Sequence, residues 1–270
     1  MMQCLKSLGH KPSGHNGRVL QHRGWRARWA AWALCSLSAL ASLPAAAHQV
    51  WLEEAGAGAK LYFGEFGDNL HEVSPGYLDK LARPTATLLG PGGEKVLKVN
   101  KEKDGFAIAG RPAKGEALIA ADPAYPVLES KEGDKPVRTV WTPAARYLSS
   151  LTAQTPKLVL DIVPTATVGE FQVFFRGSPL GGAELTLVAA SGWSRQATSD
   201  ASGKAKFTLP WKGMYGLLVR HKDATPGTRP GPKGPEAYDR SSFGTTLTFV
   251  TASGLAAPPA PPPAPPNKLE

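Results

Sequence analysis

The sequence predicts an all-β protein built from two β-sandwich domains with a few short helical turns. Glycine and proline are abundant, at 29 and 25 of 270 residues, and no stretch shows a long apolar stripe of helical period. Short runs of alternating apolar and polar residues recur instead, separated by Gly- and Lys-rich turns. We therefore expect four segments: a signal peptide over 1–47, an N-terminal β domain over 48–164, a C-terminal β-sandwich domain over 165–251 and a Pro-rich disordered tail over 252–270.

The first segment has the three-part layout of a secretory signal peptide. Three arginines between residues 23 and 28 precede an apolar run over 29–43, and small residues follow Pro44. We expect cleavage after Ala47, which makes His48 the first residue of a periplasmic protein that meets the membrane only during export. An uncleaved anchor needs about 20 apolar residues without interruption, and the serines within this run argue against it.

Removal of the signal peptide changes the charge and the cysteine content. Six of the 31 basic residues and none of the 22 acidic residues lie in 1–47, so the mature net charge is +3 instead of +9. The high isoelectric point is therefore no argument for nucleic-acid binding. Cys4 and Cys35 also leave, so the mature chain has no disulfide or thiolate metal site. Lipidation of Cys35 is disfavoured because the preceding Leu34 is bulky.

The N-terminal domain opens with two predicted strands, over 49–53 and 60–65. In the first, Val50 and Leu52 face one side and Trp51 the other. The polar loop 66–72 contains two acids and a histidine, so it is a good place to find ligands. A Ser-Pro pair then predicts a single helical turn over 74–81.

The rest of this domain reads as further strands, over 85–89, 105–108 and 116–120, with a closing strand over 158–164. The charged stretches between them are expected to be solvated hairpins. Residues 142–148 begin with a capping residue followed by proline, which predicts a short helix.

The second domain shows a clearer hairpin pattern. Strands are expected over 169–175, 183–188, 213–221 and 245–250, with Phe207 pointing inward after a tight turn. This pattern resembles small immunoglobulin-like or prealbumin-like β-sandwich modules, a resemblance that indicates fold and not function. The tail after residue 251 is a polyproline stretch without core-forming residues.

The candidate chemistry lies in the three histidines of the mature chain, His48, His71 and His221. As a first residue, His48 can chelate one metal ion through its α-amine and imidazole Nδ1. Nitrogen donors suit nickel, cobalt or copper better than calcium or magnesium. Four acids are candidates for further ligands or for orienting an imidazole: Glu65, Asp68, Asp223 and Asp239.

Other chemistry has weaker support. The sequence lacks a nucleophile elbow, a zincin motif and a phosphate-binding Gly loop, so we expect no enzyme. Trp51, Trp141, Trp193 and Trp211 suit either carbohydrate stacking or a sandwich core. An N-terminal histidine with a second histidine also resembles the copper brace of polysaccharide oxygenases, although the sequence shows no flat substrate platform.

Several motifs are shared with one known family. They are His48-Gln-Val-Trp-Leu-Glu53, Tyr62-Phe-Gly-Glu65, Gly169-Glu-Phe-Gln-Val173, Asp200-Ala-Ser-Gly203, Pro210-Trp-Lys-Gly213 and His221-Lys-Asp-Ala-Thr-Pro-Gly227 before Tyr238-Asp239. Over about residues 45–250 the chain resembles a bacterial periplasmic family of unknown function, often labelled as the periplasmic component of a cobalt or nickel transport system. The resemblance implies transition-metal handling, with His48 and His221 as site residues; the candidate role of His71 rests on its place in the polar loop alone.

Together these observations predict a soluble periplasmic protein that captures nickel, cobalt or copper for a membrane permease. The alternative is a non-catalytic immunoglobulin-like interaction or carbohydrate-binding module of the cell envelope. The metal hypothesis expects the rings of His48 and His221 within about 5 Å of each other, close enough to share an ion.

Overall fold

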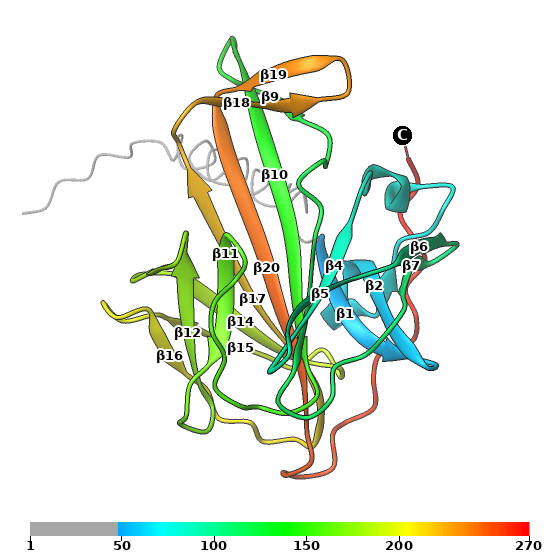
Figure 1. The fold of residues 1–270 in the computed structure, drawn as a ribbon, viewed down its shortest axis with the longest axis vertical. Coiled ribbons are helices and arrows are strands. Elements are labelled where there is room, and N and C mark those ends of the chain that lie inside the picture. Colours follow the sequence, from blue (N-terminus) through cyan, green and yellow to red (C-terminus); the bar gives the residue numbers. More distant parts are fainter. Residues whose placement is uncertain (1–47, 270) are drawn as a thin grey trace, which may run out of the picture. The chain divides into compact units, whose positions relative to one another are not determined.

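A computed structural model describes residues 48–269, and the predicted signal peptide lies outside the described residues. Within this range the protein is almost entirely β (Figure 1), which confirms the predicted fold class. Two 3₁₀ turns, η1 (Phe66–Asp68) and η2 (Tyr77–Lys80), are the helical elements of the described part. No helix among the described residues is long and apolar enough to cross a membrane.

A nine-stranded sheet forms the frame of the described residues. Its strands follow the order β15-β14-β17-β20-β10-β8-β4-β5, and β9 also pairs with β10. The bounds are β4 (Thr85–Gly90), β5 (Gly93–Leu97), β8 (Ala117–Ala121), β9 (Leu128–Glu132), β10 (Lys135–Leu148), β14 (Glu184–Ala189), β15 (Ser194–Thr198), β17 (Gly213–Asp223) and β20 (Arg240–Thr251).

The smaller sheets in the described range are formed by the remaining strands. One contains β1 (Gln49–Ala55), β2 (Gly58–Glu65), β3 (Leu70–His71), β6 (Val99–Glu102) and β7 (Gly105–Ile108); another contains β11 (Leu160–Pro164), β12 (Glu170–Phe175), β13 (Ser178–Pro179) and β16 (Lys204–Lys206). A hairpin pairs β18 (Gly227–Gly231) with β19 (Gly234–Tyr238).

The centre of the large sheet is the parallel pair β10 and β20, in register from Thr139↔Arg240 to Leu148↔Phe249. Since β10 comes from the first half of the chain and β20 from its end, the sheet contains strands of both predicted domains. The predicted boundary at 164/165 falls between β11 and β12, which pair with each other in antiparallel fashion.

The β1 sheet and the β11 sheet cover opposite faces of the large sheet. Consecutive strand residues point to opposite faces, and neighbouring threonines of β20 contact different sheets. Thr248 donates its hydroxyl to Leu52 O in β1 at 2.5 Å, whereas Thr245 donates to Leu160 O in β11 at 2.7 Å. The apolar core divides in the same way.

One core lies between β1, β2, β7 and the β4–β8–β10 part of the large sheet, and it includes Leu52, Phe63 and Tyr147. The other lies between β11, β12 and the β14–β17–β20 part, and it includes Phe171 and Leu247. Burial of such side chains contributes about 1.5–3 kcal/mol each, so each sandwich has its own source of stability.

The local predictions have mixed outcomes. Val50 and Leu52 face one core while Trp51 belongs to a different buried cluster, as the alternation predicts. The helix predicted over 142–148 is wrong, because this stretch is the end of β10. Proline is tolerated at 143 because β9 pairs with 135–139 and β8 with 144–148, which leaves 140–143 without a ladder partner on that side.

The Pro-rich tail, predicted to be disordered, makes several contacts with the rest of the described chain. It runs in extended form along the described body of the protein, with bridges from Leu255 to Trp211 and from Ala264 to Leu70. Asn69 anchors it by donating its side-chain amide to Pro261 O at 2.9 Å. The tail is the red segment of the ribbon in Figure 1. Its Asn267 lies 3.3 Å from the ring of His48, so the tail ends beside the first described residue.

Candidate functional site

His48 is held between two acids at the start of β1. Its Nε2 lies 2.5 Å from Glu72 Oε1, and its Nδ1 lies 3.8 Å from Glu65 Oε1. The ring packs on Phe63 and Tyr77, with centroids 5.1 and 5.7 Å apart. The side chain of His48 is 25% exposed and that of Glu72 is fully buried. One ring nitrogen therefore faces the interior and the other faces the surface acid.

Glu72 reaches this position because β2 folds back onto β3. Gly64 and Glu65 pair with His71 and Leu70, and the backbone N–H of Glu72 donates to Phe63 O at 2.8 Å. Gly64 has φ +144, and a Cβ there would lie 2.1 Å from Leu70 O. Glycine is thus required for the close approach that brings the acid beneath His48.

The C-terminal tail completes the surroundings of Glu72. Asn267 donates its backbone N–H to Glu72 Oε2 at 3.2 Å and its side-chain amide to Glu72 Oε1 at 2.7 Å. The same amide nitrogen lies 3.3 Å from His48 Nε2. The buried carboxylate is therefore satisfied by groups from the two ends of the described chain.

Glu65 forms the outer side of the site. Burial raises the pKa of its carboxyl group above the usual value, a hydrogen bond with Asp68 raises it further, and His48 opposes the shift. Asp68 itself is exposed on η1. Asp68 comes from the loop 66–72 that the sequence marks as a source of ligands, whereas Glu65 is the last residue of β2.

This arrangement determines which atoms of His48 are available. A buried carboxylate accepts a proton-bearing nitrogen, so the contact with Glu72 favours the tautomer with its proton on Nε2. Nδ1 then keeps its lone pair and points toward Glu65. Nδ1 is also the nitrogen that can close a chelate ring with the α-amine of a first residue. The described side chains thus offer one imidazole nitrogen and one carboxylate, with Glu72 as the orienting partner.

His71 lies in a different environment. Its ring packs on Trp51 at 5.1 Å and on Tyr62 at 4.6 Å, on the face of the β1–β2 pair opposite to Phe63. Burial lowers the pKa of its imidazole, so the neutral form is favoured. The structure gives His71 an aromatic packing role and does not place it beside His48.

His221 lies on the other face of the large sheet. Its ring packs on Phe175 of β12 at 4.4 Å, whereas the preceding Arg220 points to the opposite face and donates Nη2 to His48 O at 3.1 Å. The predicted closeness of the His48 and His221 rings therefore finds no support in this geometry. The residue of β17 that contacts His48 is the arginine.

The remaining predicted acids have local partners. Asp223 accepts from Arg176 at 2.8 Å and from the Thr225 N–H at 3.0 Å, and Asp239 accepts from the Arg138 N–H at 2.7 Å. Both contacts tie strand ends together. Neither acid is among the groups that surround His48.

The tryptophans do not gather into one exposed platform in the described residues. Trp51 is fully buried, and Trp193 packs edge-on against Trp211 at a centroid distance of 6.4 Å. Trp141 lines a cavity beside His48 together with Tyr77 and Tyr125.

Sequence reasoning missed Glu72 and Asn267 as site residues. The loop 66–72 was recognised as polar, but its acid at 72 becomes buried only through tertiary packing. Within residues 48–269, no group of three or more His, Cys, Asp or Glu side chains is arranged to hold a metal ion. A metal at His48 would accordingly depend on a donor beyond these side chains, and the α-amine is the obvious one.

Comparison with known proteins gives one match. A family model described as a domain of unknown function (DUF4198) matches residues 148–223. No curated protein and no solved structure matches the chain. The matched segment runs from the end of β10 to the end of β17, so it includes Arg220 and His221 and excludes His48, Glu65 and Glu72.

Proposed function

We propose that the mature protein is a periplasmic metal-binding protein that captures nickel, cobalt or copper at His48 and passes the ion to a membrane permease. The observation that carries this proposal is the contact between His48 Nε2 and the fully buried Glu72. It orients the imidazole so that Nδ1 is free for a metal, which is the role that carboxylates play behind metal-bound histidines.

The donor set fits a transition-metal ion. The α-amine and Nδ1 of His48 are joined through Cα, Cβ and Cγ, so both can bind one ion in a chelate ring. The Glu65 carboxylate lies 3.8 Å from Nδ1, near enough for both groups to contact an ion at about 2 Å bond lengths. Calcium and magnesium prefer oxygen ligands, so the two nitrogens favour nickel, cobalt or copper.

The proposal depends on cleavage after Ala47, because the α-amine exists only when His48 is the first residue. It assigns no catalytic step to the protein. His48 and Glu65 bind the ion, while Glu72 and Asn267 position the imidazole. His71 and His221 remain outside the set, because each packs on aromatic rings elsewhere.

The test measures nickel, cobalt and copper affinity of the protein beginning at His48 by titration calorimetry. His48→Ala should abolish tight binding, and Glu72→Gln should weaken it by about 10–100-fold. One extra residue before His48 should have the effect of His48→Ala because it displaces the amine. His221→Ala is the matched control and should bind as the parent does.

Equal affinities for the parent and His48→Ala would contradict the proposal. Loss of affinity in His221→Ala but not in His48→Ala would move the site to the other face of the large sheet. Metal-independent binding of glycans, without any of these affinities, would favour the carbohydrate-binding alternative.

A further inference from the structure

A cavity of about 260 Å³ lies beside His48, between the β1–β2 hairpin and the loop before β9. Aromatic rings form its wall. The ring of Tyr125 meets that of Trp141 edge-on at 4.6 Å, and Phe63 lies 6.3 and 6.1 Å from these two rings. Tyr77 closes the side next to His48. The volume is just below the range of about 300–1,000 Å³ that is usual for ligand pockets, so it suits a small ligand.

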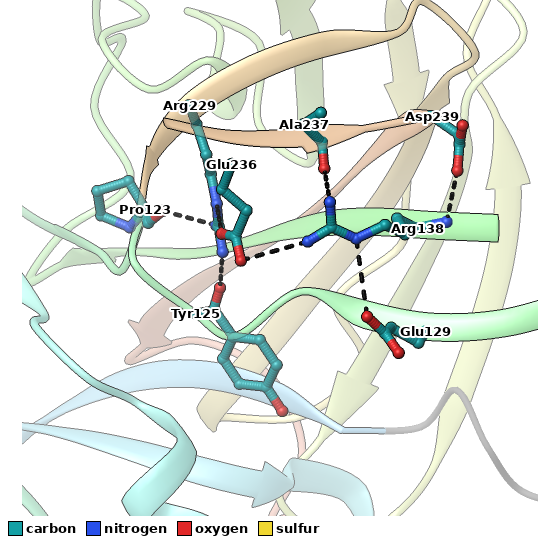
Figure 2. Close-up of polar contacts among 8 residues, drawn as sticks. All are labelled: Pro123, Tyr125, Glu129, Arg138, Arg229, Glu236, Ala237 and Asp239. Carbon is teal, nitrogen blue, oxygen red and sulfur yellow. Dashed lines mark hydrogen bonds and ion pairs between the residues drawn. The ribbon is translucent and has the colours of Figure 1, made fainter. Parts of the chain in front are cut away.

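The wall at Tyr125 is fixed by the β18–β19 hairpin (Figure 2). Arg229 donates Nη2 to Tyr125 O at 2.7 Å and Nη1 to Pro123 O at 3.1 Å. Its Nε donates to Glu236 at 3.0 Å, and Arg138 approaches the other oxygen of this acid at 3.5 Å. Figure 2 shows the Tyr125 ring pointing away from the hairpin. The backbone that carries the Tyr125 ring is therefore fixed before a ligand binds, which reduces the ordering cost of binding on this side of the cavity.

The charged side chains that line the cavity are positive, whereas the acids Glu65 and Glu72 lie behind the His48 ring. Lys80 and Arg220 line it, with Lys80 Nζ 4.2 Å from the centre of the Tyr77 ring. Arg220 is held at the rim by its hydrogen bond to His48 O. Among the described residues that line the cavity, none is Asp or Glu. An aromatic cage can also bind an organic cation, but these two cations would repel one.

We propose that this cavity binds a small planar organic anion with one aromatic ring and a carboxylate. The ring packs against Trp141 and Tyr125, which stack and meet other rings edge-on. The carboxylate lies toward Lys80 and Arg220, whose N–H groups form charge-assisted hydrogen bonds with it. Burial raises the pKa of Tyr125 to about 12, so its hydroxyl stays protonated and adds no negative charge to the cavity. The proposal goes beyond the metal site and requires no metal.

The test uses the metal-free protein beginning at His48 and benzoate as the ligand, measured by titration calorimetry and by tryptophan fluorescence. We expect benzoate to bind more tightly than benzyl alcohol, which lacks the charge, and than cyclohexanecarboxylate, which lacks the aromatic ring. Lys80→Gln should weaken benzoate binding about five-fold and leave benzyl alcohol binding unchanged. Trp141→Leu should weaken both, with folding checked by circular dichroism.

Lys157→Gln is the matched control, since Lys157 is half-exposed and pairs with Glu94 away from this cavity; it should bind benzoate as the parent does. Absence of benzoate binding, equal binding in Lys80→Gln, or a preference for benzyltrimethylammonium would each overturn the proposal. If benzoate does not bind while His48→Ala still loses metal affinity, the proposed cavity ligand is wrong and the proposed metal site stands.

Discussion

Two buried carboxylates, Asp161 and Glu72, lie on opposite faces of the large sheet and have different surroundings. Asp161 accepts from Arg146 Nε and Nη2 at 3.0 and 2.5 Å and from the backbone N–H groups of residues 157, 158 and 162. Arg146 and Asp161 are both fully buried. We call this the closed pair, because both side chains lie inside one sandwich and neither reaches the surface. Its further hydrogen-bond partners come from neighbouring segments.

Glu72 is equally buried, but its partners are His48, which is partly exposed, and Asn267 of the tail. Its histidine leads to a second acid and to an aromatic cavity. The comparison teaches that burial of an acid alone does not indicate a site. Glu72 is the better candidate for a site, because its partner His48 is partly exposed and directs Nδ1 toward Glu65.

The largest expected effect is on the closed pair. Arg146→Ala leaves the Asp161 charge buried without its main partner, which should lower the free energy of unfolding by about 3–5 kcal/mol. Urea denaturation followed by circular dichroism measures it. Lys157→Gln, which removes only the exposed contact with Glu94, should cost about 0–1 kcal/mol.

A double replacement, Arg146→Met with Asp161→Leu, separates the ion pair from the packing. Because both charges leave together, it should be closer to the parent in stability than Arg146→Ala is. If Arg146→Ala costs no more than Lys157→Gln, the pair is not the closed structural element described above.

An intermediate effect is expected at the pair of Glu72 and the partly exposed His48, which we call the open pair. Asn267→Ala removes two donors from Glu72, which should cost about 1 kcal/mol in metal binding, or roughly a five-fold loss of affinity. Asn267→Asp should weaken binding further, since it places a second carboxylate beside Glu72. Calorimetry with nickel measures both variants.

The neighbouring Lys268→Ala is the control for this prediction. Its side chain is exposed, so it should bind metal as the parent does. If Asn267→Ala behaves like Lys268→Ala, the tail covers the site without contributing to it.

The fold class could be predicted from the sequence because alternation is a local signal. It placed Val50 and Leu52 on one face of their strand and Trp51 on the other, as the structure has them. It failed at Pro143, where the local capping pattern favoured a helix. One strand that pairs with β10 along this stretch is β20, about 100 residues away, and no local pattern shows that pairing.

The site could be predicted only in part for the same reason. The polar loop and His48 after the predicted cleavage site are visible in the sequence, whereas the burial of Glu72 and its contact with Asn267 depend on tertiary packing. The histidine pair shows the limit most clearly. Alternate side chains of β17 point to opposite faces of the sheet, so only one of Arg220 and His221 can face His48. A shift of one residue in the strand register would exchange the two.

The smallest expected effect concerns His71, whose imidazole packs between Trp51 and Tyr62 without an acid partner of the kind that His48 has. Burial lowers its pKa in the folded state, so the unfolded chain binds a proton more readily near the usual value of about 6.5. The stability from the neutral ring is therefore complete above about pH 6.5 and is lost as pH falls through the lower folded value. His71→Phe keeps an aromatic ring and removes this titration. Between pH 8 and pH 5, the free energy of unfolding should fall more for the parent than for His71→Phe, as measured by urea denaturation at each pH. If the free energies of the two proteins fall in parallel, the packed ring of His71 does not contribute to the acid sensitivity.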